Sequence, residues 1–389
     1  MFKNRLLKSP DHSFFLFGPR GVGKTTWLKK NFPQDLRFDL LSARVFLELS
    51  RDPSLLEARI GDLAAGRWVL IDEIQKLPSL LDEVHRLIEE KQFKFALTGS
   101  SARKLKRSGA NLLAGRAHTL EMFSLTLPEW PVEFDLNRAL NWGGLPLSIL
   151  SSSPKEFLRS YFYTYLKEEI QEEGLVRQID PFIRFLEVAG ILNGQVLNVE
   201  NISRETGVKR VTLDKWFLIL EDTLVGYRLP AWRPKIKVRE SAHPKFYWFD
   251  PGVARAAAGL LDDPVDNVWL GYSLETWLLH EIRSYNSYHK KFRNLFYYSL
   301  PSDLDIDLII ETKRQTSSAK AEIIGIEFKL GKKWKREWEG PLRDLSKSNK
   351  VIVKQMIGIY MGTEVLKYGD FKVLPAETFL KQLHAGKIF

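Results

Sequence analysis

Short apolar segments alternate with amphipathic helical patterns along the first third of the chain. The strand-like apolar runs are residues 13–17, 36–40, 67–71, 93–98 and 117–123. Helical patterns lie between these runs, as in residues 24–32 and 80–91. Strands separated by helices are typical of a parallel sheet with helices packed on its faces. Residues 1–127 are therefore predicted to form an α/β domain.

The pattern changes after this domain. Turn-rich segments with proline, tryptophan and glycine ("LPEWPVEF", "NWGGLP") lead into a helical stretch near residues 154–173. The patterns that follow are three short helices and a strand, at residues 181–192, 198–207, 209–223 and 224–232. Three helices followed by a β-wing describe a winged helix-turn-helix. We therefore predict a second unit over residues 128–255, made of a helical linker and a winged helix.

Alternation of strands and helices resumes in the last third of the chain. The predicted elements are a helix at 271–285, strands at 294–300, 306–312, 322–330 and 356–362, and a helix near 337–347. A final strand and helix follow in the tail "FKVLPAETFLKQL". This pattern predicts a small α/β domain over residues 256–389.

Composition and charge narrow the class of protein. The chain has 389 residues, of which 44% are hydrophobic and 27% charged, as in a soluble globular protein of two or three domains. It contains no cysteine, which excludes disulfides and thiolate metal sites. No apolar run approaches the ~20 residues that span a bilayer, and the start is too short in apolar residues for a signal peptide, so a cytoplasmic location without membrane contact is expected. The net charge of +10 favours polyanionic partners such as nucleic acid.

The segment "GPRGVGKT", Gly18 to Thr25, fits the phosphate-loop pattern G-x-x-x-x-G-K-[ST]. It lies between a predicted strand and a predicted helix, which is the context that this motif requires. Its backbone N–H groups and the positive end of the helix would hold phosphates. Lys24 would reach the β- and γ-phosphates of ATP, and the Thr25 hydroxyl would bind Mg²⁺. The predicted nucleotide-binding residues are Gly18, Pro19, Arg20, Gly21, Val22, Gly23, Lys24, Thr25, Thr26, Thr98 and Ser100.

Acidic and polar residues at the ends of two further strands complete this prediction. Asp72 follows the apolar run of residues 67–71 and would hold the Mg²⁺, while Glu73 would polarise the attacking water. Thr98 and Ser100 end the next strand, where ligands bind in open α/β sheets. An acidic turn without catalytic function is the alternative interpretation of Asp72 and Glu73.

Arg116, in the glycine turn "LLAGRA", is the candidate arginine finger for the γ-phosphate. Such an arginine contributes about 10³–10⁵ in rate. A plain salt bridge is the alternative interpretation of Arg116. Arg20, Arg103 and Arg107 are competing candidates for the finger.

Together the segments "FGPRGVGKT", "LIDEIQK", "LTGSSARKL", "LLAGRA" and "WGGLP" resemble prokaryotic ATP-binding proteins of the AAA+ superfamily. Those proteins carry a C-terminal domain of unknown function. The resemblance extends over nearly the whole chain. It implies ATP hydrolysis between subunits of a homo-oligomer, with Arg116 acting in trans, and a winged helix after the ATPase core.

The winged-helix segment is rich in basic residues. The candidates for DNA contact are Lys209, Arg210, Thr212, Lys215 and Arg228. Arg233, Lys235, Lys237 and Arg239 follow the wing as a basic run. Such residues would mostly bind phosphates, giving salt-sensitive binding with weak sequence preference. A dimerisation or spacer module with a solvated lysine-rich helix is the alternative.

The strand at 322–330 carries Glu327 and Lys329 on one face, because side chains alternate along a strand. Asp303, Asp305 and Asp307 alternate onto one face of the preceding segment, so a hairpin would bring Asp307 beside Glu327. Two carboxylates make a Mg²⁺ site, and a lysine can orient or deprotonate the attacking water.

The helix at 271–285 adds Glu275 as a possible further acid. This arrangement resembles the PD-(D/E)XK nuclease fold, although "PSD" at 301–303 replaces a clean Pro-Asp. One alternative is an edge strand with a charged outer face. Another is a fold that grips DNA without cleavage through the basic and aromatic residues Lys332, Lys333, Trp334, Lys335, Arg336 and Trp338.

These observations predict Mg-dependent ATP hydrolysis coupled to DNA binding, remodelling or translocation. Three hypotheses remain open at this point. The protein is an ATP-driven translocase or nuclease on duplex or branched DNA, a DNA-binding ATPase with an inactive nuclease-like domain, or a nucleotide-controlled protein-interaction switch that does not involve DNA.

Overall fold

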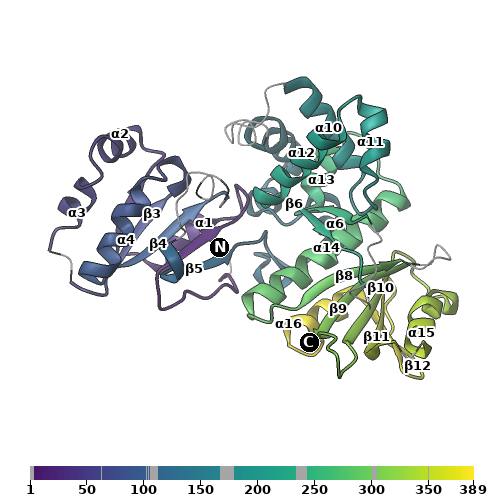
Figure 1. The fold of residues 1–389 in the computed structure, drawn as a ribbon. Helices are drawn as coiled ribbons and strands as arrows, with labels where there is room; N and C mark the ends of the chain where they lie inside the picture. The colour runs from purple at the N-terminus through teal and green to yellow at the C-terminus, as the bar shows by residue number, and fades with distance from the viewer. Residues whose placement is uncertain are drawn as a thin grey trace.

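The structure is a computed structural model that describes residues 4–62, 64–101, 103, 105, 113–166, 179–233, 243–299, 305–348 and 350–389. An N-terminal sheet with its helices stands to one side, and the middle helices and a second sheet lie together on the other (Figure 1). Within these described ranges, no helix is both long and apolar enough to cross a membrane.

The first sheet has five parallel strands in the order β2-β3-β4-β1-β5. Its strands are β1 (Phe14–Phe17), β2 (Leu36–Asp39), β3 (Trp68–Asp72), β4 (Lys94–Gly99) and β5 (His118–Glu121). All the strands predicted for this region are confirmed, with small shifts at their ends. The helices are α1 (Lys24–Asn31), α2 (Ala43–Arg51), α3 (Leu55–Ile60) and α4 (Leu80–Lys91).

The continuous apolar runs of these strands are explained by burial on both faces of the sheet. In β1, Phe14 and Leu16 belong to the core that contains Trp27 of α1. Phe15 and Phe17 belong to the opposite core, with the apolar face of α4. A strand covered on both faces has no wet side, so its sequence shows no alternation of apolar and polar residues.

The middle of the chain is mainly helical, and its three predicted short helices are confirmed. The elements are α6 (Leu136–Trp142), α7 (Pro146–Leu150), α8 (Pro154–Ser160), the π-helical segment Tyr161–Leu166, α10 (Ile179–Ile191), α11 (Val199–Thr206), α12 (Arg210–Asp222), β6 (Gly226–Leu229), β7 (Lys245–Trp248) and α13 (Pro251–Ala257). Helices α11 and α12 are joined by a short turn, and β6 pairs antiparallel with β7. The sequence pattern did not predict β7.

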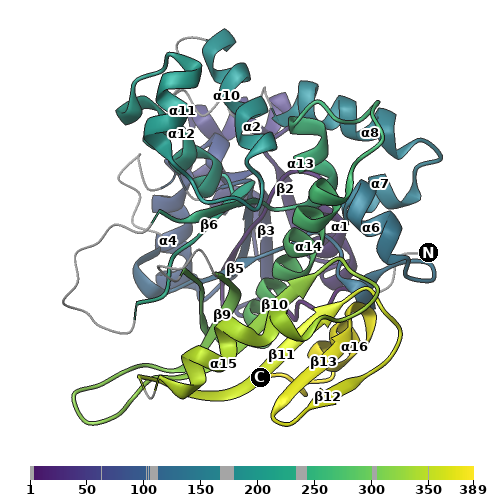
Figure 2. The same cartoon turned by 90° about the vertical axis from the view of Figure 1, so that its right-hand side faces the viewer.

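The last third forms a six-stranded sheet in the order β12-β13-β11-β10-β9-β8. Its elements are α14 (Asn267–Tyr288), β8 (Asn294–Ser299), β9 (Asp305–Lys313), β10 (Glu322–Lys329), α15 (Gly340–Lys347), β11 (Ile352–Tyr360), β12 (Leu366–Tyr368), β13 (Phe371–Pro375) and α16 (Ala376–His384). The predicted helices and strands are confirmed, and β12 is an addition. Helices α14 and α16 share the core on one face of the sheet, and α15 packs on the other face (Figure 2).

The three parts of the chain share cores. One core joins α1 and β1 to α10, α12 and α13. A second core joins Leu229 of β6 and Tyr247 of β7 to Trp277 of α14 and to the C-terminal sheet. Side chains of the middle part are therefore positioned to contact groups in both sheets.

Candidate functional site

The phosphate loop connects the carboxyl end of β1 to the amino end of α1. Two of its glycines, Gly21 and Gly23, have φ angles of 81° and 100°. These values lie in the left-handed region, where glycine carries no steric penalty. The space beside Gly23 is open, since no atom of the described residues, other than its two chain neighbours, lies within 4 Å of the position a Cβ would take. The loop thus has the backbone conformation that its glycine pattern predicts.

Lys24 is folded over this loop. Its side chain is buried, and its Nζ donates to the carbonyl oxygens of Gly18 at 2.7 Å and Pro19 at 3.1 Å. The amine therefore lies at the loop backbone, where the phosphates of a nucleotide would bind. Thr25, the next residue, donates its hydroxyl to Oδ2 of Asp72 at 2.8 Å.

Asp72 and the end of β4 meet because β4 lies beside β3 in the sheet. The Thr98 hydroxyl donates to Oδ1 of Asp72, and the Glu73 backbone N–H donates to the Thr98 hydroxyl at 3.3 Å. Gln75 donates through its amide to the Glu73 carboxylate and to the Ser100 hydroxyl at 3.2 Å. The structure thus brings together the acidic pair, Thr98 and Ser100, as the sequence indicated.

Arg37 is a member of this site that the sequence did not reveal. It lies on β2, next to β3, and its guanidinium contacts Oδ2 of Asp72 at 2.6 Å. Asp72 is 2% exposed, so this cation neutralises a buried carboxylate. Nothing in the segment "LRFDL" indicates that its arginine reaches the strand that ends in Asp72.

Arg116 lies at the opposite end of the sheet from the phosphate loop of the same chain. Strand β5 pairs with β1 so that Glu121 is level with Phe17, the residue before Gly18. Arg116 precedes β5 and is therefore roughly 16 Å away along the strand direction, at ~3.3 Å per residue. Its guanidinium contacts Glu89 and lowers the pKa of that carboxyl. Arg116 is thus remote from its own nucleotide site, and a role in trans stays a prediction.

The other candidate arginines lie in different surroundings. Arg103 forms an ion pair with Asp222 at 2.6 Å, which links the region of the first sheet to α12. The carbonyl oxygen of Arg20 accepts a hydrogen bond from the Tyr161 hydroxyl at 2.8 Å. Tyr161 belongs to the middle part of the chain and is buried on the phosphate loop. Arg107 lies outside the described residues.

Four of the basic side chains predicted for DNA contact fall into two groups. Lys209 and Lys215 are exposed at the start and on the outer face of α12. Arg210 pairs with Glu200 at 2.8 Å, and Arg228 binds Glu221 through its Nε at 2.7 Å. Thr212, the fifth candidate, lies in the first turn of α12. Arg233 is described, whereas Lys235, Lys237 and Arg239 lie outside the described residues.

The C-terminal sheet brings Asp307 and Glu327 together as the hairpin argument predicted. Strands β9 and β10 pair antiparallel, with Leu308 opposite Ile326. Asp307 Oδ2 accepts from the Phe328 backbone N–H at 2.8 Å and lies 3.6 Å from Nζ of Lys329. Lys329 also contacts the Glu327 carboxylate. Asp303 and residues 301–302 lie outside the described residues.

A second lysine, Lys245 of β7, enters this carboxylate cluster from the middle part of the chain. Its Nζ lies 3.7 Å from Oδ1 of Asp307 and 3.9 Å from Oε2 of Glu275. Tyr247, two residues further along β7, donates its hydroxyl to Glu275 Oε2 at 2.8 Å. Lys245 lies within an apolar strand that was itself not predicted, which explains why no sequence signal pointed to this lysine.

Burial controls the protonation of this cluster. It raises the pKa of Glu275 to about 7, and nearby Asp307 acts in the same direction while Lys245 opposes it. Burial and the charge of Asp307 also raise the pKa of Glu327 well above its ordinary value. Burial alone would lower the pKa of Lys245, but the surrounding carboxylates together raise it. The ammonium of Lys245 is thus held in its charged form.

These contacts bear on the predicted Mg²⁺ site at Glu275, Asp307 and Glu327. Among the residues that the structure describes, no group of three or more His, Asp or Glu side chains is arranged to hold a metal ion. Oε2 of Glu327 is buried without a hydrogen-bond partner, but Lys245 and Lys329 bring two ammonium groups to the carboxylates. The carboxylates thus lie in a charge network with two lysines, and the Mg²⁺ site at Glu275, Asp307 and Glu327 stays a prediction.

The structure thus has a phosphate loop followed by Lys24 and Thr25, an Asp-Glu pair on a nearby strand, and a five-stranded parallel sheet. These features are those of the P-loop NTPase fold. Residues 11–130 match the model of an AAA domain, residues 133–263 match a domain of unknown function (DUF8612), and residues 270–379 match a domain of unknown function (DUF4143). The first part of the chain therefore carries a P-loop domain that matches an AAA domain.

Two mycobacterial proteins resemble a large part of the chain. The uncharacterized proteins Mb2031c of Mycobacterium bovis and Rv2008c of Mycobacterium tuberculosis are each 26% identical to it over 307 residues. The matched region is 76% of this chain and 67% of each relative.

Solved structures with some likeness include two Aeropyrum pernix proteins and one from Thermotoga maritima. The ORC1 protein in complex with DNA has a TM-score of 0.30 and 11% identity, over 66% of this chain and 87% of that chain. The ADP form of ORC2 has a TM-score of 0.33 and 12% identity, over 64% of this chain and 87% of that chain. A structure of the Thermotoga RuvB protein has a TM-score of 0.28 and 17% identity, over 56% of this chain and 82% of that chain. TM-scores this low support no conclusion about the present chain.

Proposed function

We propose that the protein binds ATP with Mg²⁺ on the loop Gly18–Thr25 and hydrolyses the γ-phosphate. The observation that supports this most is the hydrogen bond of 2.8 Å between the Thr25 hydroxyl and Asp72. It brings two oxygen ligands of the kind Mg²⁺ prefers to the edge of the phosphate loop. Thr25 and Asp72 would hold the ion, which when bound neutralises charge on the β- and γ-phosphate oxygens.

The remaining side chains have separate roles in this proposal. Lys24 would leave the carbonyls of Gly18 and Pro19 and donate to the phosphates. Glu73 would orient the attacking water, with Thr98 and Ser100 holding the acidic pair in place. Arg116 of a neighbouring subunit would complete the site, so a homo-oligomer is part of the proposal.

Two substitutions separate nucleotide binding from hydrolysis. Lys24→Ala removes the phosphate contact, so both ATP binding and turnover are expected to be lost. Glu73→Gln keeps the shape of the side chain and removes its charge, so binding persists while turnover falls by about 10²-fold or more. Lys29→Ala, an exposed lysine of α1, is the matched control and is expected to match the wild type. Turnover by Glu73→Gln at the wild-type rate would refute the role of Glu73.

We further propose that hydrolysis is coupled to DNA, duplex or branched, through the middle and C-terminal parts of the chain. The net charge of +10 and the exposed Lys209 and Lys215 on α12 support this proposal. ATPase rates with and without DNA across a salt series test it. Rates indifferent to DNA at every salt concentration would favour a nucleotide-controlled protein-interaction switch. DNA cleavage at the C-terminal cluster stays a prediction from the sequence.

A further inference from the structure

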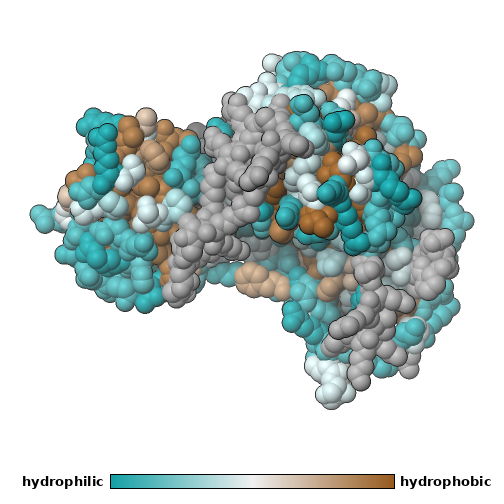
Figure 3. All heavy atoms as spheres, turned by 45° about the horizontal axis from the view of Figure 1, so that its top comes forward, coloured by the Kyte–Doolittle hydropathy of each residue, from teal (hydrophilic) through white to brown (hydrophobic). Residues whose placement is uncertain are grey.

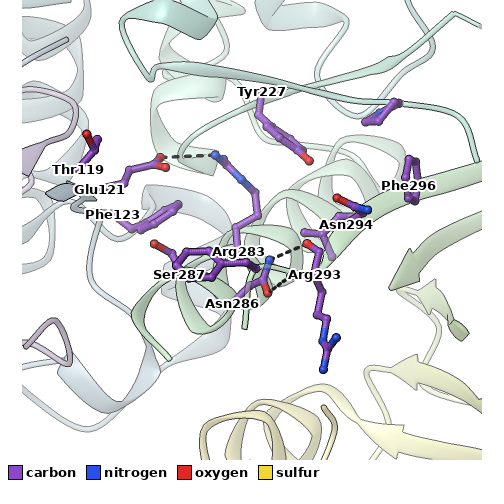
Figure 4. Close-up of a pocket in the computed structure, with 13 residues that line it drawn as sticks. Thr119, Glu121, Phe123, Tyr227, Arg283, Asn286, Ser287, Arg293, Asn294 and Phe296 are labelled. Atoms are coloured by element: carbon purple, nitrogen blue, oxygen red, sulfur yellow. Dashed lines mark hydrogen bonds and ion pairs between the residues drawn. The ribbon is translucent and has the colours of Figure 1, made fainter. Parts of the chain in front are cut away.

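A cavity of about 500 Å³ lies where the three parts of the chain meet. Its walls come from β5 and the residues after it (Glu121, Phe123), from β6 (Tyr227), from α14 (Arg283, Asn286) and from the start of β8 (Phe296). Figure 4 shows Arg283 extending from α14 toward Glu121 and passing near the ring of Tyr227. The roles proposed above for the phosphate loop and for α12 make no use of this cavity.

The cavity has aromatic walls and an internal cation. The Arg283 guanidinium lies 4.0 Å from the ring centroid of Tyr227 and 5.3 Å from that of Phe123. The Arg283 guanidinium also pairs with the Glu121 carboxylate at 3.5 Å, so the negative charge of Glu121 in the cavity wall is neutralised. A flat, polarisable ligand would find ring faces and a stacked guanidinium here.

The rim of the cavity presents a phenylalanine to solvent. Phe292 lines the cavity, is 74% exposed and has a φ of 49°, an unfavourable backbone conformation for a bulky side chain. The conformation is held by Asn286, whose side chain accepts from the Arg293 N–H at 2.8 Å and donates to the Arg293 carbonyl at 2.9 Å. The turn itself closes the end of α14, since the Lys291 backbone N–H donates to the Asn286 carbonyl at 2.9 Å. The exposed ring is different, because it gains little burial in the fold, and we take the ring as the feature that indicates a ligand.

Positive charges surround this phenylalanine. Lys290, Lys291 and Arg293 are all exposed within the same turn. Aromatic rings interleaved with basic side chains match the chemistry of an unstacked nucleobase with its phosphate, because every base has a π-face and every phosphate a negative charge. The surface seen in Figure 3 is mixed, with hydrophobic residues scattered among hydrophilic ones. An exposed ring alone is therefore not distinctive. Phe292 is distinctive because its ring lies beside an aromatic cavity and three cations.

We propose that this cavity binds a nucleobase and its phosphate, with Phe292 and Tyr227 stacking on the base and the cations of the rim binding phosphates. The source is either a free nucleotide or a nucleotide within a single strand, and the continuous basic turn favours the strand. This inference deepens the nucleic-acid part of the proposed function by naming a ligand class and a site away from α12.

The cavity is close enough to the phosphate loop for the two sites to influence each other. Glu121 is level with Phe17, which directly precedes the loop. Arg5 bridges the two regions, since its guanidinium donates to the carbonyl of Val22 at 3.0 Å and to that of Phe123 at 2.5 Å. A ligand that moves Phe123 therefore acts on a group that is hydrogen-bonded to the nucleotide site.

Anisotropy of a fluorescein-labelled oligothymidylate, titrated with the full chain in the absence of ATP, tests this inference. The wild type is expected to bind the strand, and Phe292→Ala to bind it about 5- to 100-fold more weakly, the loss of one stacking contact. Phe292→Trp keeps an aromatic face and is expected to retain the affinity. Because Phe292 is exposed, its substitution leaves the folded core intact.

Charge variants test the phosphate contacts. Replacing both Lys290 and Lys291 by alanine should reduce the slope of log affinity against log salt by about 1.4, at ~0.7 per phosphate contact on a single strand. Lys347→Ala removes an exposed lysine of α15, on the other face of the sheet, and is expected to leave the slope unchanged. An unchanged slope in the double variant would contradict the rim contacts.

Competition identifies the source of the nucleotide. Displacement of the strand by AMP would support the cavity with a free nucleotide as a sufficient ligand. Resistance to AMP combined with the Phe292→Ala defect would support the strand. Equal binding by the wild type and Phe292→Ala, or a loss confined to Lys209→Ala and Lys215→Ala, would overturn the inference. Because Lys24→Ala should bind the strand normally, failure of the ATPase proposal would be seen separately.

Discussion

The Arg37 guanidinium is paired with the Asp72 carboxylate, which is proposed to hold Mg²⁺. Removal of Arg37 should therefore strengthen Mg²⁺ binding rather than weaken it. The guanidinium lies 2.6 Å from Oδ2 of Asp72, the same oxygen that accepts from Thr25. A metal ion that takes this oxygen must displace Arg37. Arg37→Ala removes the competitor and leaves a nearly buried carboxylate without a cation in the metal-free protein.

The structure sets the expected magnitude. A hydrogen bond to a charged group contributes roughly 1.5–3 kcal/mol net, and Arg37 is only 20% exposed, so solvent screens this pair incompletely. The metal-free variant should lose stability of this order. The Mg²⁺ concentration that half-saturates ATP hydrolysis should fall about 10- to 100-fold, because the ion no longer competes with the guanidinium.

The assay is ATP hydrolysis at saturating ATP over a Mg²⁺ series, together with thermal unfolding in the presence and absence of Mg-ATP. Arg37→Lys keeps a cation and should lie between the wild type and the alanine variant. Arg44→Ala, which breaks an exposed i,i+4 pair with Glu48 on α2, is the matched control and should change neither quantity. An equal or higher half-saturating Mg²⁺ concentration in Arg37→Ala would refute the competition. A raised KM for ATP at saturating Mg²⁺ would instead make Arg37 a nucleotide ligand.

Three further predictions concern the other parts of the site. Lys245→Met keeps most of the volume but removes the ammonium that lies between Glu275 and Asp307, so urea titration should show a loss of about 3–5 kcal/mol in unfolding free energy. An unchanged unfolding free energy would contradict the network. Burial raises the pKa of Glu275 from 4.5 to about 7, so the folded state binds the Glu275 proton more tightly than the unfolded state. The stability of the wild type relative to Glu275→Gln should therefore fall from pH 5 to pH 8, and melting temperatures of the two proteins that change in parallel with pH would contradict this. Tyr161→Phe removes the hydroxyl that donates to the Arg20 carbonyl, which should lower the unfolding free energy by about 1 kcal/mol and raise the KM for ATP. An unchanged KM and melting temperature would show that this contact does not support nucleotide binding.

The first sheet could be predicted from sequence because its signals are local. Each strand is a continuous apolar run bounded by helical patterns, and the phosphate loop has a fixed spacing of glycines before Lys24. The proximity of Asp307 and Glu327 was also predictable, since alternation along two strands of a hairpin determines which side chains share a face. Strand ends were less certain, because the apolar run continues into the flanking turn, as at Leu40 after β2.

The contacts that the sequence did not reveal all depend on pairings between distant segments. Arg37 reaches Asp72 only because β2 lies next to β3. Lys245 enters the carboxylate cluster only because β7 packs against α14, and Tyr161 reaches the phosphate loop only through the fold of the middle part. No local pattern encodes such partners, so the cations that neutralise Asp72 and Asp307 required the structure.

The order of the modules is partly established and partly a prediction. The P-loop fold of the N-terminal domain is established by its parallel sheet and by the match of residues 11–130 to an AAA domain, whereas ATP hydrolysis is a proposal. The winged helix, the nuclease-like character of the last sheet and the exact division at residues 127 and 255 stay predictions. Antiparallel β6 and β7 after α11 and α12 supply the elements that a winged helix needs.

Calorimetric titration of a non-hydrolysable ATP analogue with Mg²⁺ into the wild type and into Lys24→Ala tests the nucleotide site most directly. We expect saturable binding at one site per chain in the wild type and none in Lys24→Ala. Equal affinity in both proteins, or no binding by the wild type, would show that the loop Gly18–Thr25 is not where the triphosphate binds.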